Sequence, residues 1–171
     1  MHVSLSVNTF GDGIIMKYIV LVVVIALVVL FITRSSNNKK VAVENNTTGK
    51  DFLTKNKAVE NVIETDSGLQ YQVLQHGEGS EHPTARSKVK VHYHGSLLDG
   101  TVFDSSVERG EPITFGLNQV ISGWTEGLQL MVIGDKFKFF IPSKLGYGNR
   151  AAGKIPPGSL LIFEVELLDI Q

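Results

Sequence analysis

The residues of this sequence that could take part in chemistry are mostly aromatic and lie beyond Lys90. They form an ordered series of motifs with many ring-bearing residues, two acids and no plausible nucleophile. The motifs are Val91–Gly95, Asp99–Ser106, Val120–Ile121, Gly123–Trp124, Gly146–Gly148, Ile155–Pro157 and Phe163. Such a set suits a dry pocket for an apolar ligand better than it suits bond-breaking chemistry.

Three of these residues each have a structural and a functional interpretation. Asp104 is either a turn acid that accepts backbone N–H bonds or a polar group at the edge of an apolar site. Trp124 fills the core or forms the floor of a pocket, and both roles can hold together. Tyr147 either packs in a loop or, between two glycines, turns its hydroxyl toward a ligand.

The composition excludes several classes of function. The sequence has no cysteine, which rules out disulfides, thiol catalysis and cysteine-ligated metals. Residues 51–171 carry eleven basic against fifteen acidic side chains, a balance that argues against nucleic-acid binding. His92 and His94 share one strand face, but no third metal ligand is evident nearby, so solvent-facing histidines are expected. The sequence shows no phosphate-binding loop, serine nucleophile elbow or pair of catalytic carboxylates.

Four segments alternate between apolar and polar residues, which predicts strands of an antiparallel sheet with one buried face. They are residues 69–74, 88–94, 136–141 and 161–168. Trp124, Leu128 and Met131 recur at helical spacing and predict one short helix over 123–131. A single short helix against one face of a curved antiparallel sheet is an α+β fold.

Residues 14–33 predict a single membrane-spanning helix. Fourteen consecutive apolar residues run from Ile19 to Ile32, and a helix over 14–33 is about 30 Å long, roughly one bilayer core. A cleaved secretory signal is the main alternative, because Met16-Lys17 and the apolar run match its first two parts, although no Ala-x-Ala-like site follows. A buried helix of a soluble domain is the third interpretation. The uncleaved anchor is favoured.

Three further segments flank this helix or follow it. Met16-Lys17 resembles a natural start, so the preceding residues, including the extension 1–13, are hypothesised to be an artefact. Residues 34–50 are polar without a hydrophobic period and predict a flexible linker. Residues 51–66 predict a short lead-in helix, with Asp51 as its candidate cap.

In their order, the motifs resemble the FK506-binding-protein (FKBP) family of peptidyl-prolyl cis-trans isomerases, over a domain at 67–171. Ser67–Tyr71 and Gly123–Met131 are similar to the bacterial macrophage-infectivity-potentiator branch of that family. The resemblance implies an antiparallel β half-barrel wrapped around one short α-helix, with a pocket between them. It implies a reaction that needs no cofactor and no metal.

The resemblance also implies roles for individual residues. Asp104, Tyr147 and Phe103 would be catalytic, and Arg109 would support the region around Asp104. The substrate-binding residues would be Tyr93, Arg109, Val120, Ile121, Trp124, Ile155 and Phe163. The sequence departs from the family pattern at the expected rim of the pocket, at Gln119, Ile113 and Ala151-Ala152.

The reaction implied is rotation about X-Pro peptide bonds. Amide resonance opposes this rotation by ~18–20 kcal/mol and separates charge, so a dry pocket disfavours the planar, polar ground state. The Ile121 N–H and the Tyr147 hydroxyl would hold the twisted peptide, and Asp104 would act near the rotating carbonyl. The expected function is an isomerase that assists protein folding at or near a membrane. The alternative is a non-catalytic chaperone that holds proline-containing segments.

The expected partners are proline-containing polypeptides, macrolide inhibitors of the FK506 type and a membrane, but no nucleic acid. The branch usually has a long dimerisation region, and only a short linker stands in its place here, so a monomer is expected. Arg34, Lys39 and Lys40 follow the span, which favours a cytoplasmic domain by the positive-inside rule. The branch resemblance favours export instead. The prediction is a single-pass anchor in the bacterial inner membrane with a periplasmic domain.

Overall fold

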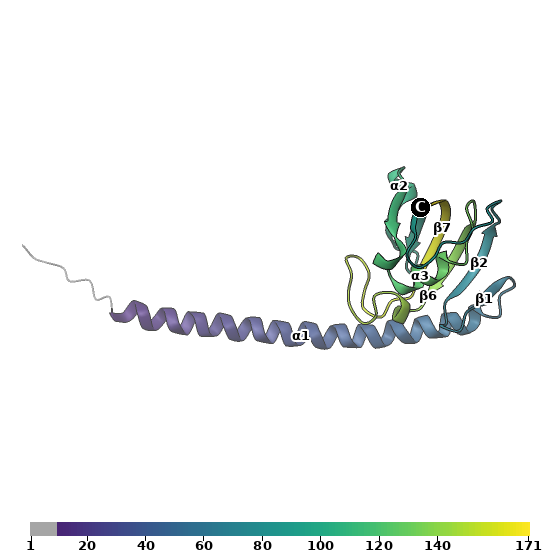
Figure 1. Cartoon of the computed structure of the whole chain (residues 1–171). Helices are drawn as coiled ribbons and strands as arrows, with labels where there is room; N and C mark the ends of the chain where they lie inside the picture. The colour runs from purple at the N-terminus through teal and green to yellow at the C-terminus, as the bar shows by residue number, and fades with distance from the viewer. Residues whose placement is uncertain (1–9) are drawn as a thin grey trace, which may run out of the picture. The chain divides into compact units, whose positions relative to one another are not determined.

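The computed structural model describes residues 10–171, with side chains from Met16 onward. The hypothesis about the extension 1–13 therefore concerns residues that lie mostly outside the described part of the chain. One long helix, α1 (Phe10–Asn56), precedes a seven-stranded sheet in the sequence (Figure 1). The chain divides into two units, one ending at Asn37 and the other comprising Asn38–Gln171.

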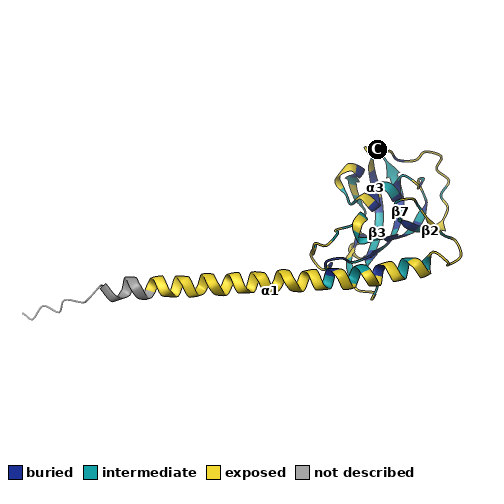
Figure 2. Ribbon diagram, turned by 90° about the horizontal axis from the view of Figure 1, so that it is seen from below, coloured by how far each residue is buried: buried dark blue, intermediate teal, exposed yellow. Residues whose placement is uncertain are grey.

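The first unit contains the apolar part of α1. Its large apolar side chains between Met16 and Ile32 are exposed on every side of the helix (Figure 2). By length and composition this helix is able to cross a membrane. A helix that is apolar all round requires apolar surroundings, either a protein core or lipid.

The second unit is built on an antiparallel sheet with the strand order β1-β2-β6-β7-β3-β4, and β5 pairs with β3. The strands are β1 (Val62–Glu64), β2 (Gln70–Gln75), β3 (Lys88–Ser96), β4 (Val102–Ser105), β5 (Ile113–Gly116), β6 (Lys136–Ile141) and β7 (Leu161–Ile170). The four segments predicted from alternation are β2, β6, β7 and β3, which lie side by side in the sheet. The three unpredicted strands have three or four residues each, too few to establish a period.

The short helix α3 (Ser122–Leu128) packs on the apolar face of this sheet and confirms the predicted α+β class. Two glycines of the helix allow this close approach. A Cβ at Gly123 would lie 2.5 Å from the Ile141 side chain, and one at Gly127 would lie 2.7 Å from the Phe139 ring. The remaining helical turns are α2 (Ser106–Arg109), η1 (Leu117–Gln119) and η2 (Ser143–Leu145).

Residues 34–50 are helical and belong to α1, so the expectation of a flexible linker there was wrong. In the second unit, one face of α1 packs on the domain. The residues of this face are buried or half-buried and recur at helical spacing, and we call them the docking seam: Ala42, Asn45, Asn46, Gly49, Phe52, Leu53 and Asn56. Most members of the seam are small or polar, so the helical period is absent from the hydrophobic pattern.

The predicted lead-in helix over 51–66 was also wrong beyond Asn56, where α1 ends. Asn61 has a φ of 65°, a left-handed conformation that a continuing helix does not contain. Val62–Glu64 then form β1 and pair with β2. Asn56 itself donates to the Gln70 side chain at 2.9 Å, which joins the end of α1 to the sheet.

Candidate active site

A cavity of about 630 Å³ lies between α3, the sheet and two loops. Its lining is Tyr93, Phe103, Asp104, Ile113, Phe115, Gln119, Val120, Ile121, Trp124, Tyr147, Ala152, Gly153, Lys154, Ile155 and Phe163. Nine of the ten site residues expected from the sequence are in this set, and Arg109 contacts two of them. A second cavity of about 620 Å³ follows α1 and contains none of the ten.

Aromatic rings packed edge to face form the floor of the cavity. Trp124 on α3 is 6% exposed, and its ring centroid lies 5.3 Å from that of Tyr93 and 5.1 Å from that of Phe163. Phe103 packs on Phe163 at 5.3 Å. Gly95 makes this possible, because a Cβ there would lie 2.7 Å from both phenylalanine rings. Such rings exclude water and offer a flat apolar surface.

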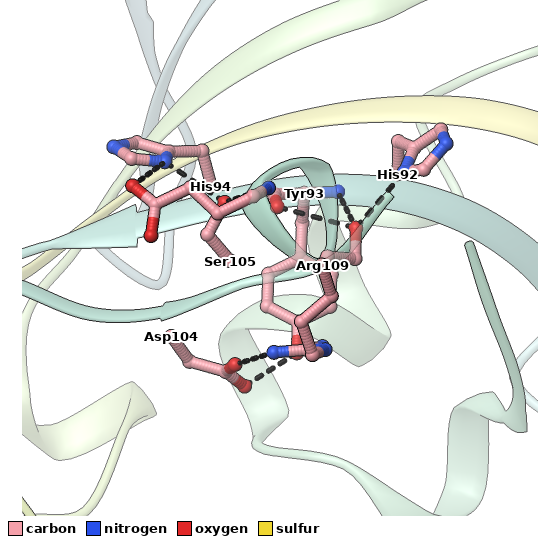
Figure 3. A network of polar contacts seen from close by, with 8 residues as sticks. His92, Tyr93, His94, Asp104, Ser105 and Arg109 are labelled. Atoms are coloured by element: carbon pink, nitrogen blue, oxygen red, sulfur yellow. Dashed lines mark hydrogen bonds and ion pairs between the residues drawn. The ribbon is translucent and has the colours of Figure 1, made fainter. Parts of the chain in front are cut away.

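Polar groups gather at one edge of the cavity, on β3, β4 and α2 (Figure 3). The Tyr93 hydroxyl donates to one Asp104 carboxylate oxygen, and Arg109 Nη1 donates to the other. Arg109 Nη2 also donates to the Tyr93 hydroxyl at 3.0 Å, and its guanidinium lies 5.7 Å from the centre of the Tyr93 ring. Two donors therefore fix the Asp104 carboxylate against the cavity.

The charges of these groups follow from their contacts. Partial burial raises the pKa of the Asp104 carboxyl, but the hydrogen bonds from Tyr93 and Arg109 and the Arg109 charge outweigh it, so the net pKa lies below its usual range. Burial, and then the hydrogen bond to Asp104, raise the pKa of the Tyr93 hydroxyl. The hydrogen bonds to Tyr93 and Asp104 raise the pKa of Arg109. The edge thus presents an anion, a neutral phenol and a cation at neutral pH.

His92 and His94 were expected to face solvent, but both are half-buried and each contacts a serine (Figure 3). His92 Nδ1 lies 3.1 Å from Ser106 Oγ, and His94 Nδ1 lies 3.0 Å from Ser105 Oγ. Ser105 also caps α2 by accepting from the Glu108 N–H. These contacts hold α2 on β3 and so help to place Arg109. Among the side chains described, those of residues 16–171, no cluster of three histidine or acidic residues is able to hold a metal ion.

Two loops also line the cavity and form part of its rim. Tyr147 lies between glycines and is 43% exposed. Ile155 closes a tight turn with Ala152, in which each N–H donates to the other carbonyl at 2.9 Å. The loops are joined by the Gly158 N–H, which donates to the Gly148 carbonyl at 2.9 Å. Val120 and Ile121 complete the rim where the chain enters α3.

Sequence reasoning missed Phe115, Gly153 and Lys154 as lining residues. Phe115 lies on β5 with its ring 5.3 Å from Trp124. Its one signal in the sequence was the alternation Ile113-Thr114-Phe115, too short to predict a strand. Gly153 and Lys154 form the tip of the turn closed by Ala152 and Ile155, and nothing in their types marks them as pocket residues.

Residues 79–168 match the family model described as FKBP-type peptidyl-prolyl cis-trans isomerase, and residues 26–73 match the domain amino-terminal to it. The FKBP-type peptidyl-prolyl cis-trans isomerase FkpA of Aeromonas hydrophila is 60% identical over 76% of this chain and 48% of its own length. The outer membrane protein MIP of Legionella longbeachae is 44% identical over 76% of this chain and 56% of its own.

The crystal structure of FkpA from Escherichia coli has a similar fold, with a TM-score of 0.76 and 37% identity. The similarity covers 98% of this chain and 75% of that one. The chain spans about half the length of the curated relatives it matches.

Proposed function

Because this chain belongs to the family of FKBP-type peptidyl-prolyl cis-trans isomerases, we propose that it catalyses rotation about X-Pro bonds in polypeptides. The observation that carries the proposal is the aromatic cavity with the Tyr93–Asp104–Arg109 network at its edge. Rotation about an amide breaks no σ bond, so it asks for neither a nucleophile nor a cofactor.

The floor of the cavity would receive the proline ring. Trp124, Phe163 and Phe103 present apolar surface there, so the prolyl amide would lose its water on entry. Resonance makes the planar amide more polar than the twisted one, and a dry site therefore favours the twisted form. This difference lowers the barrier without covalent chemistry.

Groups at the rim would bind the twisted amide more tightly than the planar one. Tyr147 and Ile121 line the cavity, and the Tyr147 hydroxyl and the Ile121 N–H would donate to peptide carbonyls. Asp104 would place a fixed negative charge beside the rotating carbonyl, where charge redistributes as resonance is lost. Arg109 keeps that carboxylate ionised and oriented.

A protease-coupled assay on an Ala-Leu-Pro-Phe peptide tests the activity. The wild-type chain is expected to isomerise the peptide well above the uncatalysed rate, which has a relaxation time of tens of seconds. Phe103→Ala removes a wall of the cavity and is expected to lose turnover. A wild-type rate equal to the uncatalysed one would refute the enzyme and leave the non-catalytic chaperone, which suppression of aggregation of a proline-rich client would identify.

We also propose that residues 14–33 anchor the chain in a bacterial inner membrane with the domain in the periplasm, where it assists folding of exported chains. The apolar helix supports the anchor, and the name of the Legionella relative supports an envelope location. Proteolysis of spheroplasts tests the orientation, because an external protease reaches a periplasmic domain. Protection of the domain would contradict it.

Macrolides of the FK506 type are proposed ligands of the same cavity. Trp124 is the one tryptophan of the sequence and lines the floor, so its fluorescence reports occupancy. Titration with the macrolide is expected to change this emission and to inhibit turnover in parallel.

The isolated chain is proposed to be a monomer. Light scattering of the detergent-solubilised chain measures its mass, and a dimer mass would contradict the monomer.

A further inference from the structure

We infer that the docking seam of α1 is part of the isomerase site and that Asn46 is a positioning residue for Tyr147; this inference rests on the proposed function. Asn46 does not line the cavity. Its amide nitrogen donates to the Asn149 side-chain oxygen at 2.8 Å, and its oxygen accepts from the Ser143 hydroxyl. One side chain of α1 therefore holds both ends of the loop that carries Tyr147.

Several backbone hydrogen bonds hold this loop, but the Tyr147 side chain has few restraints of its own. Tyr147 is exposed and has a glycine on each side, so neither side-chain packing nor backbone stiffness restrains it strongly. Within the loop, the Gly146 and Gly148 N–H groups both donate to the Ser143 carbonyl, at 2.9 and 2.8 Å. The backbone on both sides of Tyr147 is therefore bonded to Ser143, and Asn46 holds Ser143 through its hydroxyl.

The neighbouring residue of the seam holds the second rim loop. Asn45 donates from its side-chain amide to the Pro157 carbonyl at 2.9 Å, two residues beyond Ile155. Gly158 has a φ of 77°, and a Cβ there would overlap the Ala42 carbonyl, so this loop lies directly on the helix backbone. Two adjacent asparagines of α1 therefore fix both loops of the rim.

Fixing the loops matters for turnover because a catalytic hydrogen bond depends on the position of its donor. A Tyr147 hydroxyl free to move would spend little time where it binds the twisted amide. The loss would fall on kcat more than on KM, since this hydrogen bond is stronger in the transition state than in the bound substrate. A purely structural role for Asn46 predicts no such split.

A double-mutant cycle between Asn46→Ala and Tyr147→Phe tests the coupling. Asn46→Ala is expected to lower kcat about three- to tenfold, the range set by loss of one positioned hydrogen bond. In the Tyr147→Phe background the same substitution is expected to cost nothing further, because both changes remove one contribution. Thr47→Ala is the matched control. It lies on the exposed face of the same helix turn, and its hydroxyl bonds only the Val43 carbonyl within α1.

Additive losses in the cycle, or an Asn46→Ala variant with wild-type kcat, would overturn the inference. Amide hydrogen exchange of Gly146 and Gly148 in the ligand-free chain gives a readout that needs no activity. Both amides are expected to exchange faster in Asn46→Ala than in Thr47→Ala, and equal exchange would overturn the inference as well. If the wild-type chain shows no turnover but the two amides still exchange faster in Asn46→Ala than in Thr47→Ala, the proposed function is refuted and the link between α1 and the loop is retained.

Discussion

Asp104 lines the cavity, but its position depends on Arg109, which does not line it. Its side chain is 45% exposed, and it is fixed by the Tyr93 hydroxyl and by Arg109. Arg109 has the fork geometry to reach both groups at once, which a lysine lacks. Arg109 is the last residue of the short helix α2. The contacts of Ser106 with His92 and of Ser105 with His94 hold this helix in place.

Replacing Asp104 by asparagine is expected to lower kcat/KM about tenfold, which corresponds to ~1.4 kcal/mol of transition-state stabilisation. The amide keeps the shape of the carboxylate and removes its charge. Folding is expected to survive, since an exposed ion pair contributes about 1 kcal/mol or less to stability. Turnover on the Ala-Leu-Pro-Phe peptide and thermal unfolding measure the two effects. Equal turnover in the variant and the wild type would remove Asp104 from the mechanism.

The same residue sets a pH dependence of stability. Because the folded pKa of Asp104 lies below its usual range, the folded state binds fewer protons than the unfolded state at acid pH. The contribution of this group is therefore complete above the unfolded value of about 3.9 and is lost as the pH falls through the folded pKa.

The difference in unfolding free energy between wild type and Asp104→Asn is expected to be constant from pH 5 to 8 and to shrink toward pH 3. Added salt should also reduce this difference, because the pair is exposed. Urea unfolding at each pH measures it. A difference that grows on acidification would contradict the assignment.

At the scale of elements, the docking seam is the face of α1 that contacts the domain. Small residues bring the helix backbone close to the loops, and a Cβ at Gly49 would lie 3.1 Å from Leu160. Phe52 then packs on Phe140 with ring centroids 5.7 Å apart. The seam combines close backbone approach at one end with aromatic packing at the other.

Two glycine substitutions separate backbone strain from helix contact. Gly158 and Gly100 have φ values of 77° and 84°, so alanine at either costs about 1–2 kcal/mol of left-handed strain. At Gly100 the new Cβ meets nothing within 4 Å, whereas at Gly158 it overlaps Ala42. Gly158→Ala is therefore expected to destabilise by about 1–3 kcal/mol more than Gly100→Ala.

Chemical denaturation measures both variants, and limited proteolysis shows whether α1 has become accessible. Cleavage within residues 38–56 is expected in Gly158→Ala and not in Gly100→Ala. Equal destabilisation with no new cleavage would mean that the seam contributes little to the stability of the second unit.

The two kinds of element differ in how far the sequence predicts them. The four central strands have six to ten residues each, enough for alternation to mark the buried face. The seam left no such mark, because asparagine, alanine and glycine carry no hydrophobic period and their partners lie about 100 residues away. The lining of the pocket could likewise be predicted only in part. Nine lining residues were predicted from motifs, whereas Phe115 and Lys154 come from short segments without a motif.

At the scale of the whole molecule, the proposed membrane anchor is the apolar half of α1. Val24→Arg places a charge near the middle of the proposed span, at a cost of about 2.5–3.5 kcal/mol for insertion. The variant is expected to move from the membrane pellet to the soluble fraction. Val43→Arg is the matched control, since Val43 is an exposed valine on the same helix outside the span.

Carbonate extraction followed by immunoblotting measures the distribution of both variants. Intact mass of the mature chain tests the competing cleaved signal at the same time, because a cleaved product lacks the residues before the cut. Retention of Val24→Arg in the pellet, equal to that of Val43→Arg, would contradict the anchor.

The separation along the chain between the seam and its partners also has a consequence for biosynthesis. Asn45 and Pro157 are 112 positions apart, and at ~5–20 residues per second a ribosome needs roughly 5–20 s to cover that interval. During that time Asn45 and Asn46 lack the loops that they bind, although Asn56 and Phe52 meet earlier partners at Gln70 and Phe140. Completion of the docking seam is therefore a late event of translation that follows the last loop of the pocket, and a truncated nascent chain that lacks Pro157 cannot form the Asn45 contact.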